Sequence, residues 1–357
     1  MVRSTEAIQR TSGDDLAPLG AEPLVSVCVP AFNAARFIEI ALGSILAQTY
    51  RRLEVIVVDD ASTDGTADLV ERFADSRLRS IRGARNAGAY ATTCRAMSLA
   101  RGELVAIYHA DDVYDPAIVE KEVACLRRQP SAGAVFTQNR MIREDGSLIG
   151  VNRLPPAFRG RELFEYGEVF RFLLRNKNIL LCAPTFMGRR EVIAELALSG
   201  SGRYHIAYDL DMWVQVLRRH AIAILDEPLM AYRHSAGQFT SRYGQLRVTQ
   251  EVFFDLMDDY ITADGWQGRL TADDLREYAF HRLDDATLRA VHHIVRNEPD
   301  SARTLLADEF AWRSLIAHPT RRKLRVLLMR VFLRAALAVG AGPMTVPILV
   351  RTEGIRL

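Results

Sequence analysis

The sequence predicts an α/β domain whose mainly parallel sheet is flanked by helices, followed by an α-helical C-terminal region. From Leu24 onward, short β-rich runs alternate with amphipathic helical stretches, which is typical of a parallel sheet covered by helices. The run over 53–58 is apolar apart from Glu54, as a strand buried on both faces requires. After Gln245 the apolar residues follow a helical period throughout, which predicts a separate helical region.

The elements of the α/β domain are expected in the order that this alternation gives. We expect a strand at 24–30, a helix at 34–47, a strand at 53–58, a weak strand at 78–81, a helix ending near residue 100, a strand at 103–108, a hairpin of 134–142 with 147–151, and a strand at 221–225 before a turn at 227–229. A helix that ends at Arg128 should begin at Pro116, with Asp115 as its N-cap.

Charge and cysteine content indicate which partners and which cellular compartment to expect. The formal net charge is +2, from 46 basic and 44 acidic residues spread through the chain, so nucleic acid is not an expected partner. The four cysteines have no CxxC spacing and lie in apolar segments, which favours a reducing compartment. The N-terminal tail has no continuous apolar run that could serve as a signal peptide. We therefore expect a cytoplasmic protein.

Two acidic pairs follow two of the expected strands. Asp59 and Asp60 end the strand at 53–58, and Asp111 and Asp112 come shortly after the strand at 103–108. In open parallel sheets, ligands bind beyond the carboxyl ends of the strands, so both pairs indicate one site. The chain has no GxxxxGK[ST] loop, and no GxGxxG follows the first strand. The usual phosphate-loop and dinucleotide motifs are therefore excluded.

An ordered series of short motifs resembles one known family. The series consists of VSVCVPAFN at 25–33, SILAQTY at 44–50, LEVIVVDDASTDGT at 53–66, Asn86 with Gly88, ARGE at 100–103, and the second acidic pair followed by Pro116. Together they resemble the inverting family 2 glycosyltransferases of GT-A fold, a Rossmann-like α/β architecture. The resemblance covers about residues 24–240, and the absence of the processive QxxRW signature favours the bacterial non-processive type.

The resemblance implies transfer of a sugar from a nucleotide-diphosphate sugar, in this family mostly a UDP sugar, to an acceptor hydroxyl with inversion. The expected acceptor is a saccharide or glycoconjugate, lipid-linked ones included, in bacterial polysaccharide or glycoconjugate synthesis. The chain would then divide into a disordered tail (1–22), a GT-A domain (23–243) and a helical region (244–357). The donor half of the domain would be about 23–130 and the acceptor half about 131–243.

The resemblance assigns the nucleotide to the first two strand ends. Pro30, Ala31, Phe32 and Asn33 would hold the base, since a strand end offers free backbone groups and a ring on which to stack. The alternative is that Phe32 belongs to the core. Asp60, with Asp59 beside it, would contact the base or ribose. The alternative is that both aspartates cap the next turn.

A divalent cation, Mg²⁺ or Mn²⁺, is implied at the second acidic pair, because hard cations prefer carboxylate oxygens and offset the charge of a diphosphate. The D-x-D-D pattern of the family begins with Asp where this chain has His109. The metal would therefore rest on Asp112, while Asp111 binds ribose or shares the metal. His109 is either a further ligand or a histidine packed beside the site.

Four further residues are considered as donor contacts. Many relatives have an arginine where this chain has Thr93 and Cys94, so Arg85, or Arg82, would contact phosphate from the preceding loop. Arg233 matches a family arginine that closes over the diphosphate. His234 is carried as the accompanying histidine, although the family histidine usually falls one place later, where this chain has Ser235. For all of these the alternative is a solvated surface residue.

The segment from Tyr208 to Trp213 resembles the E-D-x-D-L-W segment of the family, so Asp209 matches its catalytic carboxylate. This residue would be the general base that accepts the proton of the acceptor hydroxyl. Asp211 lies about 200° around the helix from Asp209. The two cannot share one target, and we expect Asp211 to act as a cap.

The C-terminal region offers two interpretations. Lys323, Arg330 and Arg334 share a helical stripe, which is typical of a basic helix resting on a membrane surface, here at the cytosolic face. Arg325 lies on the opposite side, which favours a helix packed against the protein. A spanning segment is not expected, because arginines interrupt the apolar run.

Two other functions compete with transfer. A sugar nucleotidyltransferase would share the sheet and the metal but needs a glycine-rich loop with a basic residue after the first strand, where this chain has Ala31, Phe32 and Asn33. A non-catalytic relative that only binds a nucleotide sugar is the second alternative, since His109 and Cys94 depart from the family pattern.

Overall fold

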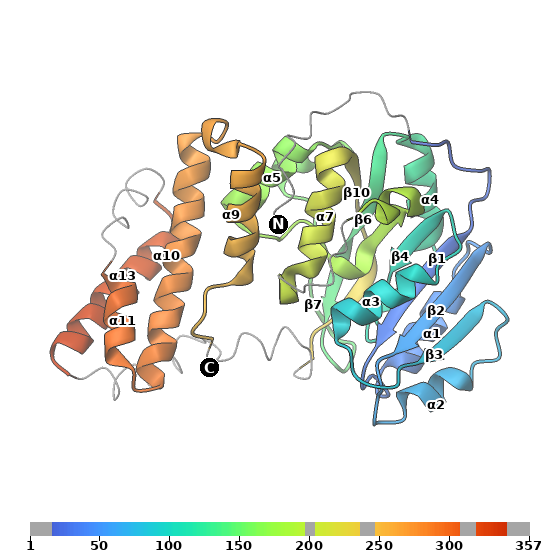
Figure 1. The fold of residues 1–357 in the computed structure, drawn as a ribbon, viewed down its shortest axis with the longest axis horizontal. Coiled ribbons are helices and arrows are strands. Elements are labelled where there is room, and N and C mark those ends of the chain that lie inside the picture. Colours follow the sequence, from blue (N-terminus) through green and yellow to red (C-terminus); the bar gives the residue numbers. More distant parts are fainter. Residues whose placement is uncertain (1–15, 197–203, 236–246, 308–318, 341–357) are drawn as a thin grey trace, which may run out of the picture. The chain divides into compact units, whose positions relative to one another are not determined.

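The computed structural model describes residues 16–196, 204–235, 247–307 and 319–340 (Figure 1). These residues form two compact units. The first, here called the sheet unit, holds the described residues up to 170 and from 178 to 235. The second, the helical unit, holds 171–177 and the described residues beyond 246. Most of the expected tail lies outside the described residues, but the Ala17 carbonyl accepts a hydrogen bond from Arg189 Nη1 at 2.9 Å.

The sheet unit is built on a ten-stranded sheet in the order β3-β2-β1-β4-β9-β6-β10-β5, with β7 beside β6 and β8 beside β10. The strands are β1 (Val25–Ala31), β2 (Leu53–Asp59), β3 (Leu78–Arg82), β4 (Leu104–Ile107), β5 (Val113–Tyr114), β6 (Ala132–Ile142), β7 (Leu148–Val151), β8 (Leu163–Phe164), β9 (Phe186–Arg189) and β10 (Ala221–Arg233). Strands β3, β2, β1 and β4 are parallel, as are β6 and β10. The predicted α/β fold with a mainly parallel sheet is confirmed. The short strand β9 lies antiparallel between β4 and β6, and β5, β7 and β8 are antiparallel to their neighbours.

Helices cover this sheet as the alternation predicts. They are α1 (Ile38–Leu46), α2 (Thr66–Glu71), α3 (Ala89–Ser98), α4 (Ile118–Arg128), α6 (Arg190–Ala194) and α7 (Tyr208–Arg219), with single 3₁₀ turns at Pro156–Phe158, Ala183–Thr185 and His205–Ala207. Helix α5 (Tyr166–Asn176) begins in the sheet unit and ends in the helical unit. Helix α3 packs on β1 and β2, whereas α4 and α7 pack on β6 and β10 (Figure 1). The predicted hairpin is confirmed as the antiparallel pair β6 and β7.

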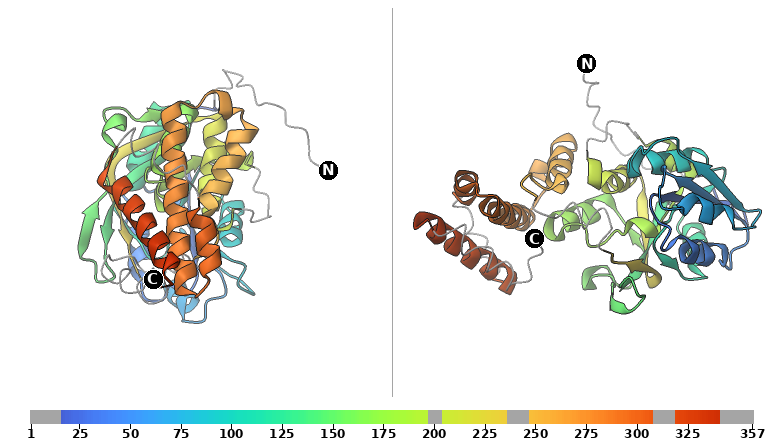
Figure 2. Two further views of the ribbon diagram at one scale, coloured as in Figure 1. Left: turned by 90° about the vertical axis from the view of Figure 1, so that its left-hand side faces the viewer. Right: turned by 90° about the horizontal axis from the view of Figure 1, so that it is seen from below.

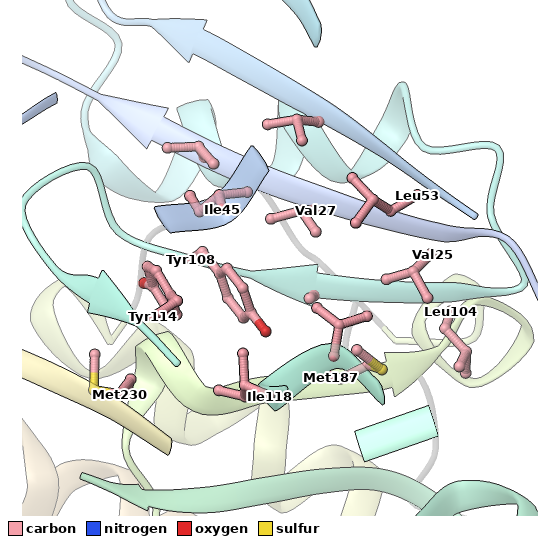
Figure 3. Packing of buried hydrophobic residues seen from close by; sticks show 14 of the residues in the cluster. Val25, Val27, Ile45, Leu53, Leu104, Tyr108, Tyr114, Ile118, Met187 and Met230 are labelled. Atoms are coloured by element: carbon pink, nitrogen blue, oxygen red, sulfur yellow. The ribbon is translucent and has the colours of Figure 1, made fainter. Parts of the chain in front are cut away.

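The core of the sheet unit lies between the parallel strands and their helices. Val27 of β1, Leu104 of β4, Ile45 of α1 and Ile118 of α4 are buried in one cluster (Figure 3). Each buried side chain of this size contributes about 1.5–3 kcal/mol relative to an exposed one. This packing fixes the positions of β1, β2 and β4, and thereby of the loops that follow them.

The polar residue inside β2 has a structural role. Glu54 is buried and accepts hydrogen bonds from Ser26 Oγ at 2.6 Å and Arg101 Nη2 at 2.7 Å. Burial alone would raise its pKa, but these hydrogen bonds outweigh burial and lower the pKa of Glu54. A Cβ at Gly102 would lie 2.5 Å from the Leu24 carbonyl oxygen. The ARGE motif therefore joins the N-terminal ends of β1, β2 and β4.

Three expected element boundaries were wrong, and the first is that helix α1 begins at Ile38 rather than at residue 34. Helix α4 begins at Ile118 rather than Pro116, and Asp115 is not its N-cap. The chain first forms β5, which pairs with β10, and the Asp115 carboxylate accepts the N–H of Ala117 two residues on. The strand expected at 221–225 continues through the expected turn to Arg233. Its pairing with β6 is irregular around Pro228, so the missing N–H of proline interrupts the ladder without ending it.

The helical unit consists, in its described part, of the end of α5 with α9 (Val252–Ala263), α10 (Ala272–Val295), α11 (Pro299–Leu306), α13 (Arg321–Ala338) and a 3₁₀ turn at Trp266–Gly268. Helix α10 packs against α11 and α13 (Figure 2). Thr271 and Asp274 form a capping box at the start of α10. Among the described helices, none is long and apolar enough to cross a membrane.

The basic stripe that was expected on the surface of α13 is partly inside the helical unit. Lys323 and Arg330 are each only 3% exposed. Lys323 pairs with Glu277 at 2.5 Å, and Arg330 donates to Thr287 Oγ1 at 3.0 Å. The membrane interpretation based on these two cations was wrong, because their charges are satisfied within the fold.

Candidate active site

The ends of three parallel strands meet at one edge of the sheet unit. Strand β1 lies between β2 and β4, so the loops after β2 and β4 flank the loop after β1. The N–H of Asp60 donates to the Ala31 carbonyl at 2.8 Å, which joins the ends of β1 and β2. Chain order reverses direction on either side of β1, and such switch points are where open α/β sheets bind ligands.

The loop after β1 exposes an aromatic ring. Phe32 is 50% exposed, so the interpretation of this ring as core was wrong. Asn33 adopts a left-handed conformation with φ of 48°. Its N–H donates to Ser62 Oγ at 2.8 Å, and its side-chain oxygen accepts the N–H of Thr63 at 2.9 Å. Asn33 therefore fixes the loop after β1 to the loop after β2 and leaves the ring of Phe32 open to a ligand, beside Pro30 and Ala31.

Asp59 and Asp60 are both buried but have different partners. The two oxygens of Asp60 accept the N–H groups of Ala87 and Gly88 at 2.8 and 2.9 Å. Asp59 Oδ2 accepts the N–H of Ser62 at 3.0 Å, and its buried Oδ1 has no partner. The turn-capping alternative thus describes Asp59, whereas Asp60 holds the loop before α3. Contact of either aspartate with a nucleotide stays a prediction.

The second acidic pair forms a compact cluster with the preceding histidine. His109, Asp111 and Asp112 each present one potential ligand atom, and these atoms lie within 4.8 Å of one another. Asp112 is fully buried, and its Oδ1 accepts the N–H of Arg233 at 2.8 Å. Asp112 Oδ2 is buried without a hydrogen-bond partner, and His109 Nδ1 lies 3.7 Å away from it.

The electrostatics of this cluster are unfavourable in the absence of a cation. Burial raises the pKa of Asp112 well above its usual range, and the charge of Asp111 raises it further, although the N–H of Arg233 lowers it. Burial lowers the pKa of His109, against the influence of Asp111. A buried carboxylate is costly unless it is paired or bound to a metal. The unsatisfied oxygen and its neighbouring ligand atoms therefore fit a divalent cation.

The Arg233 guanidinium is bound to backbone carbonyls. It donates to Asp111 O at 2.8 Å, Glu144 O at 3.0 Å and Arg143 O at 3.3 Å, and it stacks over the Phe37 ring at 4.5 Å. The residue is 4% exposed. Sequence comparison with the family indicated a diphosphate contact but not this set of carbonyls, which only tertiary packing brings together. The immediate consequence of these bonds is that they fix the turn carrying the acidic pair.

The other expected phosphate contacts are exposed. Arg85 lies exposed in the loop after β3, and Arg82 is paired with Glu71 and Asp68. His234 follows β10, with its ring 5.2 Å from that of Tyr232. Contact of Arg85 and His234 with phosphate stays a prediction. Arg82 is less suited to replace the family arginine, because its guanidinium is already held in two ion pairs.

Asp209 lies at the start of α7, as the motif predicts. Its Oδ1 accepts the N–H of Leu210 at 2.7 Å, and burial raises the pKa of Asp209 to about 6. Asp211 accepts a hydrogen bond from Gln215 Nε2 at 2.9 Å, one helical turn on. The expected capping role of Asp211 was wrong, since α7 has Ala207 as its N-cap and no side-chain cap.

The pKa of the half-buried Cys182 thiol is influenced by both Asp209 and Asp112. Burial raises the pKa of Cys182, and the charges of Asp112 and Asp209 raise it further. Both carboxylates therefore lie within electrostatic reach of one group. The charge of Asp211 instead raises the pKa of Tyr90, for which burial is the larger cause. The sequence alone had no signal that the charges of Asp112 and Asp209 raise the pKa of the same thiol.

Comparison with known proteins identifies this α/β protein as a sugar-transferring enzyme. Residues 26–197 match the family described as "Glycosyl transferase family 2". The chain is 30% identical over 232 residues to an uncharacterized glycosyltransferase of Haemophilus influenzae, covering 62% of this chain and 68% of the relative. The chain belongs to glycosyltransferase family 2.

Other relatives carry more specific names. The putative teichuronic acid biosynthesis glycosyltransferase TuaG of Bacillus subtilis is 28% identical over 215 residues, which cover 59% of this chain and 79% of that protein. The crystal structure of S. aureus TarS 1-349 in complex with UDP-GlcNAc superimposes with a TM-score of 0.49 at 17% identity, over 79% of this chain and 90% of that one.

Proposed function

We propose that this glycosyltransferase moves a sugar from a nucleotide-diphosphate sugar, a UDP sugar, to the hydroxyl of a saccharide or glycoconjugate, with inversion. The observation that carries the proposal is the buried Asp112 oxygen without a hydrogen-bond partner, in a cluster with His109 and Asp111. This cluster supports binding of a charged, metal-associated leaving group, and the raised pKa of Asp209 at the start of α7 supports its proposed role in proton transfer.

The nucleotide would bind at the ends of β1 and β2. The exposed ring of Phe32 offers a stacking surface, and a base stacked on an aromatic ring gains about 1–3 kcal/mol. Each Asp60 oxygen already accepts one N–H, and a carboxylate oxygen can accept a second donor. Asp60 could therefore hold a base or ribose group while it keeps the loop in place.

Asp111 and Asp112 would hold the divalent cation, Mg²⁺ or Mn²⁺. When bound, such a cation supplies positive charge that offsets the charge growing on the leaving diphosphate. The chain itself contributes a fixed turn, because Arg233 binds the carbonyl of Asp111 and donates its own N–H to Asp112. The carboxylates therefore need little reorganisation when the donor binds.

Asp209 would act as the general base. As the acceptor oxygen forms its bond to the anomeric carbon, the bond from that carbon to the diphosphate oxygen breaks, and the hydroxyl proton passes to a carboxylate oxygen of Asp209. Attack opposite the leaving group inverts the configuration. A pKa of about 6 keeps Asp209 mostly ionised at neutral pH and still basic enough to accept a proton.

The metabolic setting is proposed from relatives. One relative is named for teichuronic acid biosynthesis, and a chondroitin synthase of Escherichia coli is 36% identical over 135 residues, although these cover only 20% of that protein. Both names refer to polymers of sugars. We therefore place the reaction in bacterial polysaccharide or glycoconjugate synthesis.

The test is a screen of nucleotide-diphosphate sugars with the full chain. Thermal unfolding with Mn²⁺ and each donor should reveal stabilisation by UDP sugars, since ligand binding raises the unfolding temperature by mass action. Turnover is then measured as nucleotide release with and without acceptor. Absence of stabilisation by every donor would refute the proposal, while tight binding without hydrolysis or transfer would favour a non-catalytic binding protein.

A peripheral membrane contact is proposed through a different face of α13. Leu324, Leu328 and Val331 are 50%, 60% and 51% exposed at helical spacing. Arg321 and Arg325 are exposed on the same helix, so the chemistry of this face suits a bilayer with anionic lipids.

The membrane proposal predicts sedimentation with vesicles that contain anionic phosphatidylglycerol. The triple change L324S, L328S and V331S should abolish it, whereas L275S, which alters an exposed leucine on α10, should not. Equal sedimentation of both variants would refute this contact, and concentration-dependent dimers of wild type without vesicles would show that a second copy covers the face.

A further inference from the structure

His109 is held in place by contacts that do not involve its ring. Its N–H donates to Tyr114 Oη at 2.6 Å, and the Tyr114 ring stacks on Tyr108 at 3.9 Å between centroids. Both tyrosines are buried. The backbone of His109 is therefore fixed at the end of β4, while its side chain remains 31% exposed beside the acidic pair.

The position of the imidazole relative to Asp112 fits shared ligation better than a direct bond. His109 Nδ1 lies 3.7 Å from Asp112 Oδ2, which is too far for a hydrogen bond. Two atoms that each lie about 2.0–2.2 Å from one metal are separated by roughly 3–4 Å. Asp112 Oδ2 is fully buried without a partner, so an atom between these two groups would satisfy both.

We propose that His109 is a protein ligand of the cation, so that the site has one nitrogen and two carboxylate groups and selects Mn²⁺ and Co²⁺ over Mg²⁺. This inference rests on the proposed metal site and goes further by naming its ligand chemistry. Mg²⁺ prefers oxygen ligands in near-ideal octahedral geometry. A neutral imidazole adds affinity for first-row transition metals, in the order that rises from Mn²⁺ through Co²⁺.

Mn²⁺ alone provides a probe that does not depend on activity. In the full chain loaded with Mn²⁺, pulsed electron paramagnetic resonance should detect ¹⁴N coupling from a directly bound imidazole. H109D should remove the coupling and restore an all-oxygen site. Because the N–H bond to Tyr114 does not use the side chain, we expect H109D to fold, which circular dichroism checks.

The matched control is H234Q, since His234 follows β10 directly after Arg233, whose N–H binds Asp112. This variant should keep the ¹⁴N coupling of wild type. Coupling that persists in H109D, or that disappears in H234Q, would overturn the assignment to His109.

Metal affinities give a second measurement. Calorimetric titration should give a ratio of Mn²⁺ to Mg²⁺ affinity at least about tenfold higher for wild type than for H109D, the scale of loss common when metal-site residues are altered. Equal ratios would refute the selectivity while leaving the proposed metal site intact. No Mn²⁺ binding by wild type would refute both the inference and the proposed metal site.

Discussion

Two pairs of adjacent aspartates follow two strands that flank β1, and their surroundings differ. Asp60 accepts backbone N–H groups with both oxygens, and Asp59 accepts one from Ser62. Asp112 accepts one N–H and retains a buried oxygen without a partner. Asp59 also has one such oxygen, but among the described residues only the cluster of Asp112 groups three potential metal ligands.

This difference teaches that equivalent strand ends can serve opposite purposes. The first pair uses its charge to organise loops, because oriented N–H groups stabilise a buried carboxylate. In the second pair, one oxygen of Asp112 is buried without a hydrogen-bond partner, which costs about 1–3 kcal/mol for an unpaired buried group and more for a charged one. A cost of this kind is retained where a ligand offsets it. Substitutions that remove the charge of one aspartate at a time test whether the two pairs differ in this way.

The largest expected effect lies outside both pairs. If neither pair supplies the base, D209N should lower turnover by about 10²–10⁴-fold with donor binding nearly unchanged. Steady-state kinetics and donor titration measure the two quantities. D211N is the matched control on the same helix. Activity near wild type in D209N, with D211N folded but inactive, would move the base to Asp211.

The pH profile of the wild type provides a separate test of Asp209. The base acts when deprotonated, and burial raises its pKa to about 6. Turnover should therefore be constant above this pH and fall about tenfold for each unit below it. A profile that stays flat down to pH 5 would contradict proton transfer to this carboxylate.

Next in size is the loss of metal affinity in D112N. This variant removes the negative charge of a proposed metal ligand, so Mn²⁺ binding should weaken by about 10–100-fold. Metal-dependent UDP binding should weaken with it. The control is D59N, because Asp59 also has a buried oxygen without a hydrogen-bond partner. This variant should leave the Mn²⁺ affinity unchanged. UDP binding that is equal with EDTA and equal in D112N would contradict the metal assignment.

A smaller effect, on stability, is expected at Asp60. In D60N the amide nitrogen would face the N–H of Ala87 or Gly88, so one acceptor is lost and two donors oppose each other. The free energy of unfolding in urea should fall by about 1–3 kcal/mol. Without metal, D112N should be neutral or stabilising, because it removes a carboxyl group whose charged form burial disfavours. Equal destabilisation of both variants would remove the distinction between the pairs.

The smallest effect is expected at Asp59. In D59N the remaining carbonyl oxygen can still accept the N–H of Ser62, and the atom without a partner becomes an amide. The free energy of unfolding should change by less than about 1 kcal/mol. A loss as large as that of D60N would indicate that Asp59 supports the loops equally.

The sequence was sufficient for features that depend on local pattern. An apolar run that ends in Asp59 located β2, and a second run followed closely by Asp111 located β4. Because ligands bind beyond the carboxyl ends of parallel strands, both acidic pairs were expected at one edge of the sheet. Features that depend on distant chain segments were not predictable in this way. Asp115 failed as a cap because β5 pairs with β10, which is about 115 residues away along the chain. Lys323 looked like a surface cation because its partner Glu277 lies on another helix.

The carbonyl contacts of Arg233 also have a consequence for the order of folding. Asp111, Glu144 and Arg233 lie far apart in the chain, and their bonds close loops that span about a hundred residues. During synthesis, strands β1 to β4 emerge long before β10. The turn that carries the acidic pair therefore acquires its final set of bonds only after residue 233 has left the ribosome, and a nascent chain stopped before that point should not retain metal.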